Sequence, residues 1–344
     1  MRGRGCHIGI VGATGAVGRE MLACLERLFP EASGVRLFAS SRSAGTEFNS
    51  VFGRLVVEDL SCADFSGLDL SLFSAGKAVS LEYADKFLSL GCSVIDNSSA
   101  FRGSSGVLLC VPEVNGDLID GRVQIIANPN CSTIQLVAVL SVLERSAGLE
   151  RVQVATYQSC SGAGEGGVRA LLSETEATLR GSRPAASSVH ARCIAFDTVP
   201  QIGSFDSDGY SEEEMKMITE TRKILGLPDL GVSATCVRVP VFRGHSEVVH
   251  VKTRKALSRA DAISVLSGFA GITVCDLSGC DHYPTPYSCS GSDDIFVGRI
   301  REDKAEAGSL ILWIVSDNLL KGAALNAVQI AAKYWQRYSE RSVS

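Results

Sequence analysis

The first 150 residues alternate between short apolar runs and stretches in which apolar residues recur at helical spacing. The runs predict buried strands at residues 7–11, 35–39, 68–74, 93–96 and 123–127. Helical spacing is found at residues 20–28, 80–90 and 134–146. Strands that alternate with helices in this way are typical of an α/β domain built on a doubly wound parallel sheet.

The pattern changes near residue 150, where a second domain is predicted to begin. Residues 152, 154, 156 and 158 alternate as in a strand with one solvated or site-facing side. A helix at 210–225 follows, then strands at 236–241, 248–253, 294–300 and 310–315, and a terminal helix at 322–338. Residues 180–209 lack periodicity, which predicts a long functional loop or a dimer arm. We expect one domain at 1–131, completed by a C-terminal helix at 321–344, and a second α/β (α+β) domain at 132–320.

The amino-acid composition limits the kinds of molecule that the protein is expected to bind. The 344 residues suit two domains, and the net charge of −5 comes from mixed acidic and basic residues, which does not indicate nucleic acid or a membrane surface. The twelve cysteines include no CxxC pair and no Cys/His spacing typical of zinc, so we expect reduced thiols and no metal. The longest apolar runs are shorter than a membrane span. Small-molecule partners and a cytoplasmic location are predicted.

The first predicted strand runs directly into a glycine-rich loop. Gly12, Gly15 and Gly18 form a GxxGxxG pattern, rather than the standard GxGxxG, between a strand and a helix. Such a loop permits a tight turn and close approach to a pyrophosphate, whose charge the helix N-terminus favours. An ordinary tight turn is the alternative, but the flanking elements favour a Rossmann-type dinucleotide site.

The loop after the second strand bears on the choice of dinucleotide. Folds specific for NAD tend to place an acidic residue there for the ribose hydroxyls, whereas residues 40–43 read Ser-Ser-Arg-Ser. The Arg42 guanidinium, flanked by hydroxyl groups that include Ser43, suits a 2′-phosphate. NADP is therefore favoured over NAD, and a solvated loop arginine is the alternative.

One cysteine stands between a predicted strand and a predicted helix. Cys131 lies in the sequence Asn-Pro-Asn-Cys-Ser-Thr at 128–133, where Pro129 disfavours helix for Asn128 and small polar residues begin the helix. Unpaired N–H groups and the helix dipole favour a thiolate there and could also hold an oxyanion. Cys131 is therefore a candidate nucleophile, and a buried small hydrophobic residue is the alternative.

Basic residues supply further candidates. Arg102 lies in a polar loop at the carboxyl end of a predicted strand, where it could meet an anion or pair with a nearby acid on the surface. Arg238 lies on one side of a predicted strand, and Gly244 would let His245 stand at a turn. Among the five histidines, His245 is the best candidate for a base.

Two further features are less specific on local grounds. Glu213 and Lys216 are i,i+3 neighbours on the 210–225 helix, for which a solvated ion pair is the expected arrangement. Residues 159–164 form a second glycine-containing turn before a helix, which suits either the close approach of a ligand or a simple helix entry.

Taken together, these motifs resemble aspartate-semialdehyde dehydrogenase over nearly the whole chain. They are the glycine loop, the cysteine hexapeptide at 128–133, Gln158 with its Ser-Cys-Ser-Gly-Ala-Gly continuation, residues 238–245, and residues 313–326. The hexapeptide and the run Val-Ser-Asp-Asn-Leu-x-Lys-Gly-Ala-Ala at 315–324 are the specific motifs. The glycine loop alone would fit many families.

The resemblance implies a role for each matching residue. Cys131 would form an acyl thioester, and His245 would act as acid and base. Gln158, Arg238 and Glu213 would contact the substrate, with Glu213 at its amino group, and Arg102 and Lys216 would contact phosphate. NADP would be held by Gly12, Thr14, Gly15, Ala16, Val17, Arg42, Ser43, Ser161, Gly162 and Asn318. Lys77 stands where the resemblance leads us to expect a second glycine, so it would either touch the cofactor or point outward.

The resemblance also implies the reaction and the assembly. The reaction would be reversible, NADPH-dependent reduction of β-aspartyl phosphate to aspartate semialdehyde and phosphate. It would serve amino-acid biosynthesis from aspartate, leading to lysine through diaminopimelate, to threonine and to methionine. The second domain would carry catalysis and dimerisation, in a homodimer or homotetramer.

Three alternatives are open at this point. N-acetyl-γ-glutamyl-phosphate reductase is similar, but a glycine commonly precedes its nucleophile, whereas Asn130 does so here. A Cys/His acyl hydrolase could use Cys131 and His245, but it would leave the glycine loop and Arg42 without a role. The presence of both Cys131 and His245 disfavours a catalytically silent NADP-binding homologue.

Overall fold

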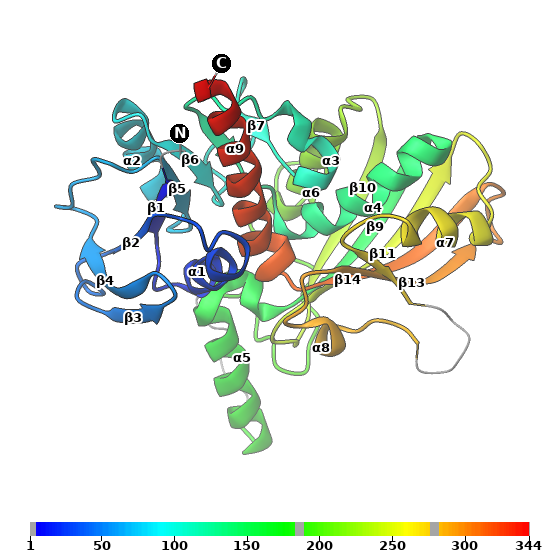
Figure 1. The fold of residues 1–344 in the computed structure, drawn as a ribbon. Coiled ribbons are helices and arrows are strands. Elements are labelled where there is room, and N and C mark those ends of the chain that lie inside the picture. The colour runs from blue at the N-terminus through cyan, green and yellow to red at the C-terminus, as the bar shows by residue number, and fades with distance from the viewer. Residues whose placement is uncertain (1–4, 183–188, 276–281, 344) are drawn as a thin grey trace. The chain divides into compact units, whose positions relative to one another are not determined.

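The computed structural model describes residues 5–182, 189–275 and 282–343, and the chain forms two compact units. Unit 1 comprises Met1–Pro129 and Ala323–Ser344, and unit 2 comprises Asn130–Gly322. Figure 1 traces the elements of both units by colour along the chain.

The described part of unit 1 is built on an eight-stranded sheet in the order β3-β4-β2-β1-β5-β6-β8-β7. Its strands are β1 (His7–Val11), β2 (Gly34–Ala39), β3 (Glu47–Ser50), β4 (Gly53–Asp59), β5 (Leu70–Phe73), β6 (Ser93–Asp96), β7 (Leu108–Leu109) and β8 (Ile125–Ala127). Every pair is parallel except β3 with β4. The central strands β5 and β6 are wholly buried, as expected for a parallel sheet covered on both faces. The predicted doubly wound sheet is confirmed.

The β3–β4 hairpin has no counterpart among the predicted strands. The side chains of β3 alternate between exposed and partly buried positions, and β4 buries only Leu55 and Val57, so the apolar pattern is too short to predict a strand. The predicted strands at 68–74 and 123–127 are also longer than β5 and β8, because the residues at their ends lie outside the sheet ladder.

Three helices of unit 1 are α1 (Ala16–Leu28), α2 (Lys77–Ser89) and α9 (Leu325–Val343). Helix α9 follows a π-helical turn, Leu320–Ala324, and packs on α1, β5, β6 and the short helix α3 (Pro112–Asn115). The buried Tyr334 hydroxyl accepts a hydrogen bond from Ser93 Oγ at 2.7 Å. The terminal segment of the chain is therefore part of the core of unit 1.

The described part of unit 2 contains a six-stranded mixed sheet in the order β10-β9-β11-β14-β13-β12. Its strands are β9 (Leu149–Gln158), β10 (Gly231–Arg238), β11 (His245–Thr253), β12 (Ile272–Val274), β13 (Ile295–Glu302) and β14 (Ser309–Ser316). Its helices are α4 (Cys131–Ala147), α5 (Gly164–Leu179), α6 (Glu212–Leu225), α7 (Arg259–Ser267) and α8 (Pro286–Cys289). Helices α4, α6 and α7 share one hydrophobic core with the sheet.

Two predicted strands of unit 2 are shifted. The strand predicted at 236–241 begins earlier in the structure, at Gly231. It also ends earlier, at Arg238, because Pro240 cannot donate to a sheet ladder. The strand predicted at 248–253 begins earlier, at His245, directly after Gly244 at φ +91°. In the predicted loop at 180–209, residues 183–188 lie outside the described ranges. Val199 of this loop exchanges two backbone hydrogen bonds with Arg238.

Other features of the described ranges bear on function. No helix there is long and apolar enough to cross a membrane. In the same residues, no group of three or more His, Cys, Asp or Glu side chains is placed to hold a metal ion. No disulfide joins the eleven cysteines that the structure describes.

The glycine loop of unit 1 yields a test of packing. A Cβ added at Gly18 would lie 2.2 Å from the carbonyl oxygen of Gly12, so Gly18→Ala must push helix α1 away from the loop. We expect a loss of about 1–3 kcal/mol in the free energy of unfolding, measured by denaturant titration. Gly103→Ala is the matched control, because its Cβ would meet nothing within 4 Å. Equal stabilities for the two variants would contradict the packing argument.

Candidate active site

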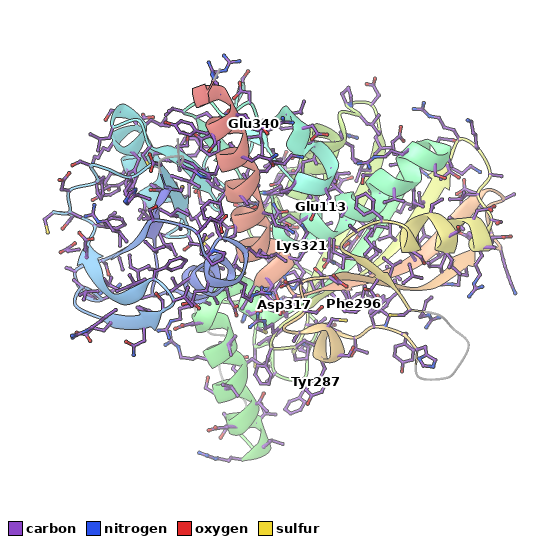
Figure 2. The ribbon with its side chains drawn as sticks, viewed as in Figure 1. Glu113, Tyr287, Phe296, Asp317, Lys321 and Glu340 are labelled. Atoms are coloured by element: carbon purple, nitrogen blue, oxygen red, sulfur yellow. The ribbon has the colours of Figure 1, made fainter. Side chains whose placement is uncertain are left out.

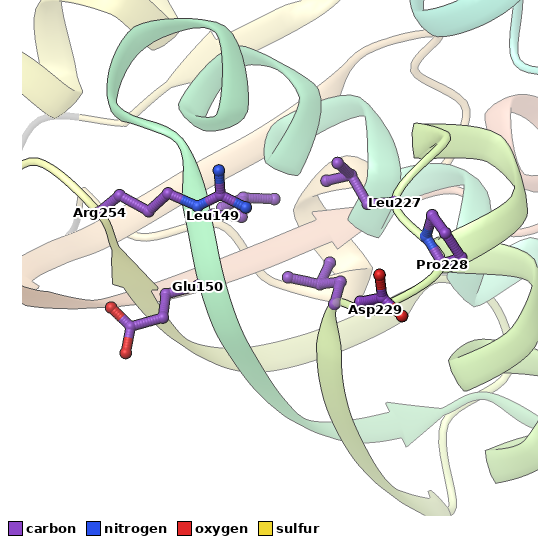
Figure 3. Close-up of a pocket in the computed structure, with 7 residues that line it drawn as sticks. Leu149, Glu150, Leu227, Pro228, Asp229 and Arg254 are labelled. Atoms are coloured by element: carbon purple, nitrogen blue, oxygen red, sulfur yellow. The ribbon is translucent and has the colours of Figure 1, made fainter.

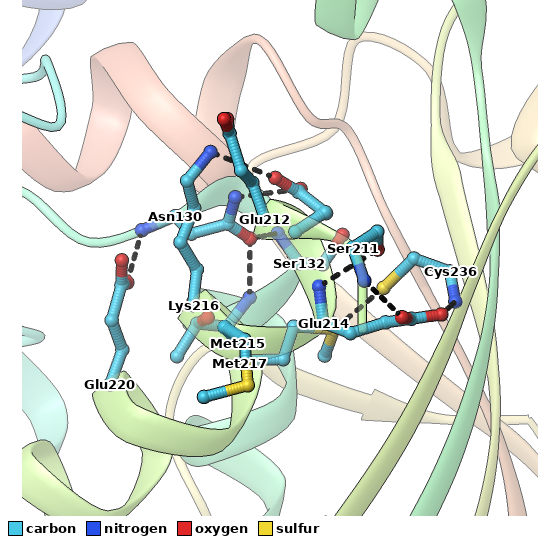
Figure 4. A network of polar contacts seen from close by, with 12 residues as sticks. Asn130, Ser132, Ser211, Glu212, Glu214, Met215, Lys216, Met217, Glu220 and Cys236 are labelled. Atoms are coloured by element: carbon cyan, nitrogen blue, oxygen red, sulfur yellow. Dashed lines mark hydrogen bonds and ion pairs between the residues drawn. The ribbon is translucent and has the colours of Figure 1, made fainter. Parts of the chain in front are cut away.

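Helix α4 begins at Cys131, as predicted, and Asn130 caps it. Asn130 Oδ1 accepts hydrogen bonds from the backbone N–H groups of Ser132 at 3.0 Å and Thr133 at 3.3 Å. The Asn130 backbone N–H donates to Glu220 Oε2 at 2.7 Å, and its side-chain amide donates to Glu213 Oε1 at 2.7 Å (Figure 4). The chain entering the helix is therefore held at three points, which fixes the backbone at Cys131.

Glu213 links this cap to the sheet. Its carboxylate accepts from Asn130 and from Gln158 Nε2 at 3.2 Å, and it pairs with Lys216 Nζ at 3.4 Å. The side chain of Glu213 is only 7% exposed, against 33% for Lys216. The expectation of a solvated ion pair is therefore wrong, because the first turn of α6 packs against α4 and β10 rather than facing water.

The strand registers bring distant residues to one edge of the sheet. Gln158 pairs with Arg238 on one side, and the β9–β11 register places it beside His245 on the other. His245 in turn pairs with Ser316 of β14. Side chains directly opposite in neighbouring strands project to the same face. These residues therefore form one row across four strands.

The position of α4 over this row is shown by Gln135. Gln135 lies four residues after Cys131, so the two side chains share one face of the helix. Its Oε1 accepts a hydrogen bond from Ser316 Oγ at 2.5 Å. The first turn of α4 therefore lies over the ends of β11 and β14, where His245 and Ser316 are found.

His245 is fully buried and neutral. Its Nδ1 accepts the backbone N–H of Ser159 at 3.1 Å, which requires the ring proton of the neutral form to be on Nε2. Burial and the nearby Arg238 cation lower the pKa of His245 to about 3. Among the described residues, Nε2 has no hydrogen-bond partner. The ring therefore offers one N–H donor to a substrate.

The glycine turn at residues 159–164 holds Arg238. Arg238 Nη1 donates to the Ser159 carbonyl at 2.6 Å, and the residue is 6% exposed. A Cβ on Gly162 would lie 2.8 Å from Nη1 and 3.3 Å from His245 Nε2. Only glycine lets the turn approach both side chains this closely.

Asn318 ties this turn to the start of β11. Its Oδ1 accepts from Ser159 Oγ and Ser161 Oγ, both at 3.1 Å, and from the Gly244 N–H at 2.8 Å. The preceding residue, Asp317, which is labelled in Figure 2, is fully buried and accepts from Arg243 Nε at 2.6 Å. These contacts hold Arg243 and Gly244, the two residues directly before His245.

The nucleotide candidates of unit 1 follow the carboxyl ends of its parallel strands. The loop from Gly12 to Val17 connects β1 with α1, and Gly12 has φ +87° with no room for a Cβ beside Ala75. Arg42 is exposed and Ser43 partly exposed, in the turn after β2. These positions are consistent with a dinucleotide site in an open α/β sheet.

Arg102 and Lys77 also belong to unit 1. Arg102 lies in the loop after β6 and donates from Nη2 to the Asn97 carbonyl at 2.9 Å. Lys77 is the first residue of α2 and is exposed, after Gly76 at φ +91°. The phosphate role of Arg102 and any cofactor contact of Lys77 remain predictions.

The structure thus gathers most of the predicted substrate and catalytic residues in unit 2. They are Cys131, Gln158, Glu213, Lys216, Arg238 and His245, with Ser161, Gly162 and Asn318 beside them. Sequence reasoning missed the roles of Asn130 and Glu220. The capping preference of Asn was one signal for the first. Glu220 lies seven residues after Glu213, which is two turns along the same helix face, and this was a signal for the second.

Two surface hollows lie elsewhere in unit 2. One, of about 140 Å³, is lined by Leu149, Leu227, Arg254 and neighbours at the amino end of β9 (Figure 3). Gln158 ends the same strand, roughly 30 Å away at about 3.3 Å per residue. The other, of about 430 Å³, includes His282 and Phe296. Neither hollow contains a predicted site residue.

Comparison with known proteins shows which families the chain resembles. Residues 7–122 match the family "Semialdehyde dehydrogenase, NAD binding domain", and residues 140–321 match "Semialdehyde dehydrogenase, dimerisation domain". The aspartate-semialdehyde dehydrogenase of Bacillus subtilis is 46% identical over 336 residues, covering 96% of this chain and 97% of that protein. The enzyme of Legionella pneumophila is 48% identical over 332 residues, covering 95% of each.

Solved structures agree. Aspartate semialdehyde dehydrogenase II of Vibrio cholerae, complexed with ASA, superposes with a TM-score of 0.93 at 41% identity, covering 97% of this chain and 99% of that one. The Candida albicans enzyme, solved with NADP, superposes with a TM-score of 0.76 at 26% identity, with the same coverage.

The two units and their site define a semialdehyde dehydrogenase with a nucleotide-binding and a dimerisation domain. Within this class, the chain belongs to the aspartate-semialdehyde dehydrogenase family, as the motif resemblance predicted. It is an oxidoreductase that catalyses the reversible reduction of aspartyl phosphate in amino-acid biosynthesis, with a nicotinamide cofactor.

The neutral state of His245 predicts a pH effect on stability. Its pKa is about 3 in the folded chain, against about 6.5 for an unperturbed histidine, so between these values the unfolded state binds a proton that the native state does not. This contribution to stability is present above pH 6.5 and is lost as the pH falls toward 3. We expect His245→Asn to lose less stability than the wild type between pH 7.5 and 5, by denaturant titration. Parallel losses would contradict a depressed pKa.

Proposed function

We propose that Cys131 is the nucleophile that carries the acyl group. The observation that supports this role most directly is the capped start of α4, which holds Cys131 over the row that contains His245. The thiolate attacks the acyl carbon of β-aspartyl phosphate, and the C–O bond breaks as phosphate leaves with its electron pair. Sulfur donates little to the carbonyl, so the thioester stays open to attack.

NADPH, when bound, supplies the hydride that reduces the thioester. His245 acts in this step through the proton on Nε2. The Nε2–H donates a hydrogen bond to the developing alkoxide of the hemithioacetal, and the alkoxide electron pair re-forms the C=O bond as the C–S bond breaks to release the aldehyde and the thiolate. Because the Ser159 N–H occupies Nδ1, only Nε2 can make this hydrogen bond.

The charged residues of unit 2 suit the two ends of the substrate. Arg238 would bind the carboxylate, which its planar fork matches with two parallel hydrogen bonds. Glu213, a buried acid, would attract the amino group, and Gln158 lies between these two residues. Lys216 would contact the phosphate, and the family resemblance assigns the same role to Arg102. The Vibrio cholerae relative was solved with ASA, which supports a substrate site in this family.

NADP is the cofactor that we propose. The loop after β2 carries Arg42 and Ser43 and no acid that would repel a 2′-phosphate. The contacts would come from Gly12, Thr14, Gly15, Ala16, Val17, Arg42, Ser43, Ser161, Gly162 and Asn318. The Candida albicans relative contains NADP, which supports this choice.

We further propose a homodimer, with a homotetramer as the alternative, in the cytoplasm. The match to a dimerisation domain supports self-association. The outer face of the unit 2 sheet carries Tyr157, 40% exposed, whose ring centroid lies 5.7 Å from that of the partly exposed Trp313 with the two rings tilted. A cysteine-rich chain with no disulfide in its described part suits a reducing compartment.

The nucleophile is tested by Cys131→Ala and Cys131→Ser. Both variants should lose phosphate-dependent reduction of NADP⁺ with aspartate semialdehyde while still binding NADPH, measured by fluorescence. N-acetylglutamate semialdehyde, run alongside, should be a poor substrate for the wild type. Near-normal turnover by the alanine variant would contradict the thioester mechanism. Ester hydrolysis without nucleotide would favour the hydrolase alternative.

The cofactor is tested by Arg42→Glu, which places a negative charge where the 2′-phosphate is proposed to lie. We expect kcat/KM for NADP⁺ to fall at least about tenfold, since a charged hydrogen bond is lost and a repulsion is added, with little change for NAD⁺. Arg54→Glu is the control, because this exposed arginine pairs with Glu47 on β3. Equal losses with NADP⁺ and NAD⁺ would remove Arg42 from this role.

A further inference from the structure

A buried acid lies directly beneath the proposed site. Glu247 follows His245 by two residues on β11, so both side chains project to the face that α4 covers. Glu247 is fully buried, and its partners across the sheet are Thr156 of β9 and Ile314 of β14. The next row down the same face is wholly apolar and buried, with Val249 on β11. Glu247 is therefore the last polar position on β11 before the core.

Glu247 faces a polar side chain that is also unsatisfied. Among the described residues, neither Glu247 oxygen nor Gln135 Nε2 has a hydrogen bond of normal geometry. Burial raises the pKa of Glu247 well above its ordinary value, and a polar interaction with Gln135 opposes this rise. Buried donors and acceptors in native proteins are almost always paired. A neutral carboxyl and an amide on facing elements can satisfy each other after a small rotation.

Gln135 connects this pair to both reacting residues. It lies one helical turn below Cys131, and its Oε1 accepts from Ser316, the residue opposite His245. A chain Glu247–Gln135–Ser316 therefore crosses from β11 to α4 and back to β14. Hydrogen bonds are directional, so contacts of this kind set the position of a helix along a sheet. Apolar packing is not directional and sets this position less sharply.

We propose that Glu247 and Gln135 form a buried brace that sets the position of the Cys131 end of α4 against the His245 end of β11. Both are positioning residues, because neither is placed to touch the substrate. The proposal rests on the proposed function in one respect, which is that Cys131 and His245 are the reacting pair.

The test compares variants of the full-length enzyme by four measurements on each. Glu247→Leu removes the brace, Glu247→Gln keeps a neutral hydrogen-bonding group, and the swap Glu247→Gln with Gln135→Glu exchanges the two partners. Val249→Ala is the control for loss of core packing on the same strand face. For each variant we would measure kcat, KM, the thermal melt, and the pH profile of Cys131 alkylation by iodoacetamide, read from the Cys131 peptide by mass spectrometry.

The brace predicts that Glu247→Leu lowers kcat about tenfold or more with a smaller change in KM, and shifts the alkylation profile. Glu247→Gln and the swap should stay within about threefold of the wild type on the same reasoning. Val249→Ala should lower the melting temperature without shifting the profile. If Glu247→Leu fails to fold, the swap compared with Gln135→Glu alone still decides, because only the swap keeps one acid and one amide.

Three results would overturn the proposal. They are wild-type kcat and profile in Glu247→Leu, equal impairment in Glu247→Gln and Glu247→Leu, or an equal shift of the profile in Val249→Ala. Alkylation needs no turnover, so it reads the position of Cys131 even if the thioester mechanism itself fails in the Cys131→Ala experiment.

Discussion

The hydrogen bond from the Asn130 backbone N–H to the buried Glu220 carboxylate determines where helix α4 begins. Both groups are almost fully buried, so water does not compete for the bond. With its backbone held, Asn130 uses one side-chain atom to cap the helix and the other to contact Glu213. Cys131 follows directly. Its backbone position, and its distance from α6, therefore depend on the residue before it.

Charge in unit 2 is arranged so that the His245 imidazole carries none. Burial and the Arg238 cation oppose protonation of His245, while the Ser159 N–H directs its single proton to Nε2. Glu213, a buried acid that contacts Gln158 of this row, is compensated by Lys216 and two amides. The Arg238 cation beside the neutral Nε2–H donor of His245 suits an anionic acyl phosphate. Both groups are already in the protonation state that attracts an anion.

Local patterns were sufficient for some features and insufficient for others. The strand, glycine turn and helix at the N-terminus, and the helix start at Cys131, depend on residues within one turn of each other, so the sequence predicted them. The β3–β4 hairpin was missed because β3 has no buried residue and β4 has only Leu55 and Val57, which is too short an apolar pattern to predict a strand. Glu213 was misjudged because the i,i+3 rule describes a helix alone in water, whereas α6 packs its first turn on neighbouring elements.

The sequence by itself determined the family, the order of the elements and the identity of the candidate nucleophile, since each is written in contiguous motifs. Only the tertiary structure decided that Gln158, Arg238, His245 and Ser316 share one row, because strand register depends on pairing between segments that lie far apart in the sequence, such as His245 with Ser316. It also decided that His245 is neutral and that Glu247 lies unsatisfied beneath it. Burial and the proximity of charges arise only when distant segments pack together, and no local pattern encodes them.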